Sequence, residues 1–134
     1  MFESLDIGAS ALEAQRVRLD TIAGNVANIN TTHDKSGKVH PYQRRFVVLA
    51  SGNAGSGDAP GVHVEQIGTE DKAPLEKFDP GNPDADKNGY VAYPAIDLST
   101  EMVDALEASR SYEANVTTME NAKAMINSTL RLLA

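Results

Sequence analysis

The stretch that decides the fold runs from Leu98 to Leu133 and reads LSTEMVDALEASRSYEANVTTMENAKAMINSTLRLL. It contains no proline, the residue that a long helix tolerates least. Residues spaced alternately three and four positions apart form a mainly apolar stripe along one face of the predicted helix, as in a coiled coil. The sequence therefore predicts one helix of about 54 Å, far longer than an average globular helix. The stripe consists of Met102, Ala105, Ser109, Tyr112, Val116, Met119, Lys123, Ile126, Leu130 and Leu133.

A second long helix is predicted at the other end of the chain, over residues 3–30. Its first row of apolar residues repeats every seven positions and consists of Leu5, Leu12, Leu19 and Val26. A second row, offset by three positions, holds Gln15, Ile22 and Ile29, where the polar Gln15 weakens the stripe. The helix is expected to fray among the asparagines and threonines of residues 25–32, because these side chains compete with helical hydrogen bonds.

The middle of the chain has a different composition from the two ends. All six prolines and eight of the ten glycines lie within residues 37–94. Short strands are predicted at residues 46–50, 62–67 and 90–93, with a flexible loop over residues 51–58. We therefore predict a mainly α fold in which two long terminal helices form a coiled-coil seam around a small irregular β-containing middle. The segments are an N-terminal axial helix (1–30), a middle region (31–97) and a C-terminal axial helix (98–134).

The composition excludes several classes of protein. The net charge of −7 argues against nucleic-acid binding, which needs clustered Lys and Arg. The absence of Cys excludes disulfides and thiolate metal sites, and 5% aromatic residues favour a small or extended core. An acidic start and the lack of a long apolar run predict neither a cleaved signal peptide nor a membrane helix.

One segment resembles half of a calcium site. Residues 84–89 read DADKNG and match the first half of an EF-hand loop, with oxygen ligands at positions one, three and five and Gly at six. Position twelve, which needs a bidentate Glu, is Ala95. An Asn-Gly turn is the favoured interpretation, and a calcium-binding module using Asp84, Asp86 and Asn88 remains an alternative. No cofactor or metal is predicted.

No catalytic residue is predicted, because the sequence has no nucleophile elbow, phosphate loop or dinucleotide fingerprint. His33, His40 and His63 have no metal-ligand spacing. Arg44 and Arg45 are interpreted as ordinary surface charge. The chain is therefore predicted not to be an enzyme.

The two ends of the chain are predicted to be assembly interfaces. A helical hairpin within the chain would satisfy part of the apolar stripes. The last turns are apolar around too much of their circumference for one partner helix, and each large side chain is worth ~1.5–3 kcal/mol when buried. The predicted interface residues are Leu5, Leu12, Leu19, Ile22, Val26, Met102, Tyr112, Val116, Met119, Ile126 and Leu130.

Motifs at both ends resemble those of bacterial flagellar rod and hook proteins. They are residues 5–7, 12–15 and 25–31 at the start, and residues 101–104 and 108–115 near the end. Residues 79–91, reading DPGNPDADKNGYV, resemble the proximal rod members of that family in particular. The short middle region also fits a proximal rod subunit better than hook or distal-rod relatives, which carry inserted domains.

The resemblance implies a structural subunit that assembles into a helical tube and transmits torque between the basal ring and the hook. It implies export through the flagellar secretion apparatus without a cleaved signal, and a place in the rod spanning the periplasm. Implied partners are copies of the chain, other rod subunits, and basal ring and rod-adaptor proteins. Another axial role, such as the other small rod subunit or a hook-junction protein, is the alternative within the family.

Overall fold

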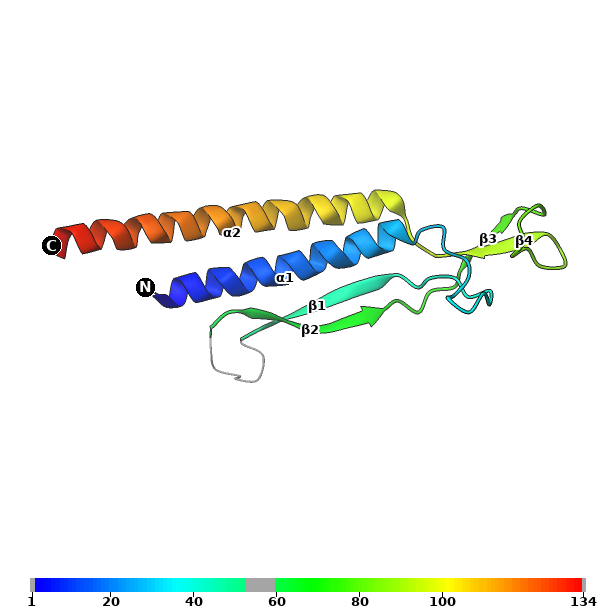
Figure 1. Ribbon diagram of the computed structural model, residues 1–134, viewed down its shortest axis with the longest axis horizontal. Coiled ribbons are helices and arrows are strands. Elements are labelled where there is room, and N and C mark those ends of the chain that lie inside the picture. The colour runs from blue at the N-terminus through cyan, green and yellow to red at the C-terminus, as the bar shows by residue number, and fades with distance from the viewer. Residues whose placement is uncertain (1, 53–59, 134) are drawn as a thin grey trace.

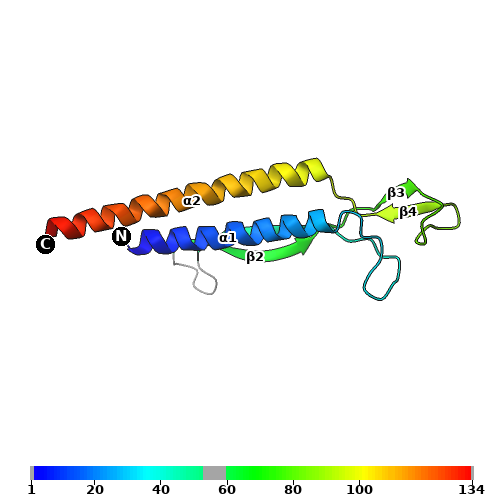
Figure 2. The ribbon, with the colours of Figure 1, turned by 45° about the horizontal axis from the view of Figure 1, so that its top comes forward.

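The computed structural model describes residues 2–52 and 60–133 and has an elongated shape (Figure 1). Helix α2 lies along helix α1, and α1 in turn lies on the β1–β2 hairpin, so the body has three layers. The smaller β3–β4 hairpin projects beyond one end of the body (Figure 2). In chain order the elements are α1 (Phe2–Ala27), β1 (Arg45–Ser51), β2 (Val62–Thr69), β3 (Leu75–Phe78), β4 (Tyr90–Tyr93) and α2 (Leu98–Leu133).

The two helices run antiparallel, and two contacts set their register. Near the start of α1, a Cβ on Gly8 would lie 2.6 Å from Cγ of Met119, so only glycine leaves room for the methionine as it stands. Near the end of α1, Asn25 donates a hydrogen bond to Glu101 at 3.1 Å. This register places Phe2 level with about residue 125, so the last turns of α2 extend beyond α1 (Figures 1 and 2).

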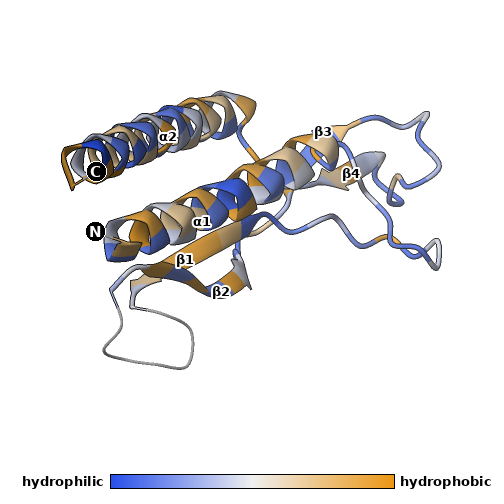
Figure 3. Ribbon diagram, turned by 60° about the vertical axis from the view of Figure 1, so that its left-hand side comes forward, coloured by the Kyte–Doolittle hydropathy of each residue, from blue (hydrophilic) through white to orange (hydrophobic). Residues whose placement is uncertain are grey.

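The β1–β2 hairpin is antiparallel and covers the side of α1 away from α2. Most of β1 is hydrophobic (Figure 3), and its register shifts between Val48 and Leu49. Phe46 pairs with Gly68, and its ring covers the glycine at a distance that leaves no room for a Cβ. The backbone N–H of Val62 donates to the hydroxyl of Ser10 at 3.1 Å, which ties the start of β2 to α1.

The β3–β4 hairpin and its connecting loop form the tip of the molecule. Leu75 pairs with Tyr93 and Phe78 with Tyr90, whose rings meet edge-to-face at 5.4 Å. The turn before β4 contains Gly89 at a φ of 82°, where a Cβ would meet Phe78 at 2.9 Å. A glycine is therefore required there both for the backbone and for the ring.

The core is small, as the composition predicted. Its buried apolar side chains lie between the helices and at the base of the tip, and they are Ala14, Ile22, Val91, Ile96 and Ala108. Thin burial of this kind fits a rod-shaped subunit rather than a thick globule. Among the residues described, no helix combines the length and apolarity needed to cross a membrane.

The sequence predictions match the elements closely, with two main differences. The helix predicted over residues 98–133 has those bounds, and the three predicted strands are confirmed as β1, β2 and β4. α1 ends at Ala27 rather than at residue 30, because residues 28–30 form a turn. Strand β3 was not predicted, and the predicted loop lies, from residue 53 on, outside the described residues.

Candidate assembly interface

The predicted row on α1 is only half-buried within the subunit. Leu5, Leu12, Leu19 and Val26 are all intermediate in exposure, whereas Ile22 of the second row is buried. Ala14 of α1 and Ala108 of α2 are almost fully buried, and Gly8 of α1 leaves room for Met119 of α2. The sevenfold row is therefore only partly covered within the subunit.

The predicted residues on α2 divide into two groups. Val116, Met119 and Ile126 are half-buried, and Met119 lies against Gly8 of α1. Met102, Tyr112 and Leu130 are exposed, with Met102 at 64% and Leu130 at 58%. Within one subunit these three residues are therefore not packed in a seam.

Two grooves run beside the helix contact and collect many of the predicted residues. Met102 and Ala105 of α2 form one wall of the first groove, and its other wall includes Leu19, Ile22 and Val26 of α1. Leu12 and Tyr112 line a second groove farther along the same pair of helices. Six of the predicted interface residues thus line these two open grooves; the first is largely apolar, whereas the second also contains Glu13, Arg16 and Asp20.

The overhanging end of α2 is the most exposed apolar part of the molecule. Leu132 and Leu133 are 87% and 81% exposed, and Met125 is 68% exposed. Phe2 at the start of α1, 75% exposed, lies at the same end of the molecule. This end has the apolar surface of an interface that the subunit does not itself cover.

At the opposite end of the helix pair, a buried polar network joins α1, α2 and the start of β1. Glu101 and Asn25 are both 0% exposed. The Asn25 amide donates to the carbonyl of Arg45 at 2.8 Å and accepts from the Arg45 N–H at 2.9 Å. It therefore holds the start of β1 as a neighbouring strand would, while its contact with Glu101 reaches α2. The sequence placed Asn25 and Glu101 in the two terminal motifs but did not predict their contact.

Arg44 is the cation of this network. Its guanidinium contacts Glu101, Asp104 at 3.3 Å and Glu70 at 3.9 Å. Burial alone would lower the pKa of Arg44, but the hydrogen bond and negative charge of Glu101, with Glu70 and Asp104, hold the pKa above its usual value. The Arg44 side chain is only 22% exposed, so the prediction of ordinary surface charge is wrong for Arg44.

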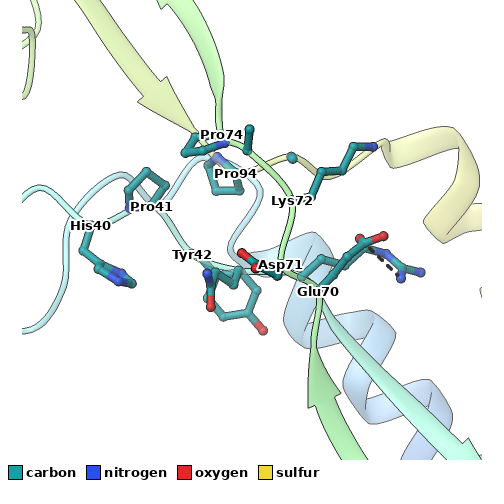
Figure 4. Close-up of a pocket in the computed structure, with 12 residues that line it drawn as sticks. His40, Pro41, Tyr42, Glu70, Asp71, Lys72, Pro74 and Pro94 are labelled. Atoms are coloured by element: carbon teal, nitrogen blue, oxygen red, sulfur yellow. Dashed lines mark ion pairs between the residues drawn. The ribbon is translucent and has the colours of Figure 1, made fainter.

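A pocket of about 350 Å³ lies where the tip joins the body (Figure 4). The two connections between body and tip, one before β3 and one after β4, meet here beside the loop that precedes β1. Each of these three segments contributes a proline: Pro74, Pro94 and Pro41. His40, Tyr42 and Lys72 complete much of the lining. The pocket therefore marks the joint between body and tip.

The segment that resembles a calcium loop uses the carboxylates of Asp84 and Asp86 in hydrogen bonds within the protein. Asp84 accepts from the Thr32 hydroxyl at 2.5 Å and contacts His33 at 3.0 Å, which ties the tip to the loop after α1. Asp86 accepts from the N–H groups of Asn88 and Tyr90. In the part of the chain that the structure describes, no three acidic or histidine side chains cluster as metal ligands do.

Comparison with known proteins gives the family. Residues 5–32 match the family model described as "Flagella basal body rod protein", and residues 87–132 match "Flagellar basal body rod FlgEFG protein C-terminal". The flagellar basal-body rod protein FlgC of Bacillus subtilis is 42% identical, covering 98% of this chain and 97% of its own length. FlgC of Borreliella burgdorferi is 37% identical, and the match covers 99% of this chain and 97% of the relative. FlgC of Salmonella typhimurium is 42% identical, and the match covers 95% of this chain and 93% of the relative.

These matches span nearly the whole chain and include both helices that carry the grooves and the overhang. The sequence motifs at the two ends lie within the two matched regions. The chain therefore belongs to the FlgC family of flagellar basal-body rod proteins, and it is a structural subunit rather than an enzyme.

Proposed function

We propose that this chain builds the proximal part of the flagellar rod, assembling with neighbouring subunits into a helical tube that transmits torque between the basal ring and the hook. The observation that carries the proposal is the exposed apolar end of α2, with Leu132 and Leu133 more than four-fifths exposed. A contact between unlike surfaces that does not close into a ring generates a helical assembly.

The predicted heptad rows fit best as seams between subunits. Leu5, Leu12, Leu19 and Val26 are half-buried in the subunit, and Met102 and Tyr112 are exposed on α2. A helix of a neighbour placed in these grooves would complete a coiled-coil seam around residues that one subunit covers only in part. On this proposal, residues 1–30 and 98–134 are axial helices and residues 31–97 form a separate middle region.

The role also determines partners and location. Copies of the chain, other rod subunits, and basal ring and rod-adaptor proteins would contact its surface, in a rod that spans the periplasm. Export through the flagellar secretion apparatus without a cleaved signal is part of the same proposal. The thin core supports it, because a subunit that buries little can pass through a channel unfolded and gain order as it docks.

Electron microscopy of basal bodies from cells lacking this chain tests the function. We expect rings from which no rod or hook extends, together with loss of swimming. Re-expression of the chain should restore both. Normal rods and normal swimming in the deletion strain would contradict the proposal, and calcium calorimetry would then test the remaining alternative at Asp84 and Asp86.

A further inference from the structure

The loop between α1 and β1 carries a local excess of positive charge in an acidic chain. Residues 28–45 contain four of the 12 Lys and Arg but only one of the 19 Asp and Glu. The loop projects at the inner end of the helix pair (Figure 2). Arg44 is already held by three carboxylates. In contrast, Lys35, Lys38 and Arg45 form no ion pair with a carboxylate in the part of the chain that the structure describes.

A pocket of about 450 Å³ opens between this loop and Thr69 at the end of β2. Its volume lies in the range of about 300–1,000 Å³ that is typical of ligand sites. Lys35 and Arg45 supply positive charge to its lining, and among the described lining residues Asp34 is the one carboxylate. Neutral groups that can donate hydrogen bonds also line it and include His40, Gln43 and Thr69.

Arg45 is held in position by the protein itself. Its backbone N–H donates to the Asn25 amide oxygen at 2.9 Å, and its carbonyl accepts from the Asn25 NH₂ group at 2.8 Å. Its guanidinium lies 5.8 Å from the centre of the Tyr42 ring. A guanidinium over an aromatic face keeps the N–H donors at its edges available. Because Arg45 is placed in advance, binding an anion would cost less conformational entropy.

The carboxylate of Asp34 is engaged within its own turn. Its Oδ1 accepts from the Ser36 hydroxyl at 2.6 Å and from the N–H groups of Ser36 and Lys38 at 2.8 and 3.0 Å. These hydrogen bonds, first that of the Ser36 hydroxyl, lower the pKa of Asp34 and keep it charged. Lys35, Arg45 and Asp34 together leave one net positive charge. One carboxylate matches this charge better than a phosphate of about −1.5 to −2.

We propose that this pocket binds a carboxylate side chain on an acidic segment of a partner protein. The Arg45 guanidinium would donate two parallel hydrogen bonds to the carboxylate, and Lys35 would add its charge from the loop. The amide of Gln43 and the hydroxyl of Thr69 would bond to the polypeptide on either side of the acid. The site goes beyond the proposed rod function and does not depend on it, because Lys35 and Arg45 lie outside the terminal helices.

Nuclear magnetic resonance of the isotope-labelled full chain tests the site. The probe is a capped peptide in which Glu alternates with Gly, and the matched control peptide carries Gln in place of each Glu. We expect the Glu peptide to shift the Nε–H resonance of Arg45 and the side-chain amide resonances of Gln43, with saturation. The Gln peptide should bind at least about tenfold more weakly, because it cannot pair with the guanidinium charge.

Variants of the full chain identify the residue responsible. Arg45→Gln should weaken binding of the Glu peptide by about tenfold or more, and Arg45→Lys should retain part of the affinity. Arg110→Gln is the matched control, because Arg110 is an exposed arginine of α2 that does not line the pocket, and it should leave binding unchanged. Circular dichroism should show the same fold for Arg45→Gln, since Asn25 holds only the backbone of Arg45.

Three results would overturn the proposal. The first is the absence of any shift at Arg45, and the second is binding of the Gln peptide as tightly as the Glu peptide or binding that survives Arg45→Gln. The third is tighter binding of inorganic phosphate than of the Glu peptide, which would make the pocket a phosphate site. None of these results changes the expected swimming or basal bodies of the deletion strain, so failure of this site and failure of the rod function are separate outcomes.

Discussion

The two ends of the helix pair differ in what stabilises them. At the inner end, where α1 stops and α2 begins, Asn25 and Glu101 are fully buried and joined to Arg44. At the outer end, Leu132 and Leu133 are almost fully exposed. Buried polar groups require specific partners, whereas an apolar surface accepts any complementary one. The chain therefore stabilises the inner end with its own side-chain contacts. Its outer end has an apolar surface that, on the proposed rod function, a neighbouring subunit would cover.

The largest effect is expected from removing the charge at the centre of the inner end. Glu101→Ala leaves the Arg44 guanidinium without its closest carboxylate and Asn25 without one acceptor. Breaking a buried ion pair in this way costs about 3–5 kcal/mol of the free energy of unfolding. Urea unfolding followed by circular dichroism measures the loss.

The chain offers a matched control in a second ion pair on α2. Glu107 contacts Arg18 of α1 at 3.5 Å, but its side chain is 64% exposed. Glu107→Ala should cost less than about 1 kcal/mol, as exposed pairs do. Equal losses for Glu101→Ala and Glu107→Ala would remove the distinction between the two ends.

A smaller effect is expected at the clamp between α1 and β1. Asn25→Ala removes the amide that both donates to and accepts from the backbone of Arg45. Leaving these buried groups without partners costs about 1–3 kcal/mol. Hydrogen exchange of the Arg45 N–H should accelerate more than that of strand β4. Unchanged exchange at Arg45 would show that the clamp does not hold β1.

The tip tests whether ordered structure extends beyond the inner end. Gly89→Ala forces a Cβ into a left-handed turn and toward the Phe78 ring, at a cost of about 1–2 kcal/mol. Gly81→Ala is the control, because its added Cβ would approach no atom closer than 3.9 Å. Thermal unfolding compares the two. If the tip unfolds at a lower temperature than the body, the region that is stable by itself comprises only the two helices and the β1–β2 hairpin.

Acid should weaken the inner end before it affects the outer one. Hydrogen bonds from the Thr100 hydroxyl and the Ser99 N–H lower the pKa of Asp97 at the start of α2, and those from Thr32 and His33 lower the pKa of Asp84. The two carboxylates bind protons more readily in the unfolded chain than in the folded one. Their contribution to the free energy of unfolding is therefore present above the ordinary pKa of 3.8 and is lost as the pH falls through the lower pKa of the folded state. Unfolding free energies measured from pH 5 downward should decline less steeply in Asp97→Asn. An identical decline would exclude Asp97 as a contributor.

A substitution in the overhanging end of α2 should change the stability of the subunit least and the assembly of the rod most. Leu130→Asp changes an exposed residue and should alter unfolding by less than about 0.5 kcal/mol. In the rod it would bury an unpaired charge and block assembly. Swimming in soft agar and electron microscopy of basal bodies measure this. Ser128→Asp, on the opposite face of the same turn, is the control and should swim. Normal swimming by Leu130→Asp would remove the interface assignment.

The sequence predicted the elements better than their contacts. The bounds of α2 follow from Asp97 at its start and a long run without proline. Strand β3 was not predicted, because the segment from Leu75 to Phe78 is short and forms a strand only by pairing with β4. α1 ends at Ala27, where the Asn28 side chain and the Asn28 backbone N–H both donate to the carbonyl of Gly24 and residues 28–30 form a turn.

The candidate interface shows the same limit. Periodicity found the apolar rows, but it could not reveal that Gly8 meets Met119 or that the rows stay half-buried within the subunit. It also could not pair Arg44 with Glu101, because they are 57 residues apart and neither has a local signal of burial. Contacts between distant polar residues need the fold to be known first.

The joint between body and tip has a mechanical consequence. Pro74 and Pro94 lie on its two connections, Pro41 lies in the adjacent loop before β1, and proline fixes the φ angle of its backbone. Both connections therefore contain a restrained backbone angle, which limits rotation of the tip about the joint. A sideways force on the tip would then be transmitted to the start of α2.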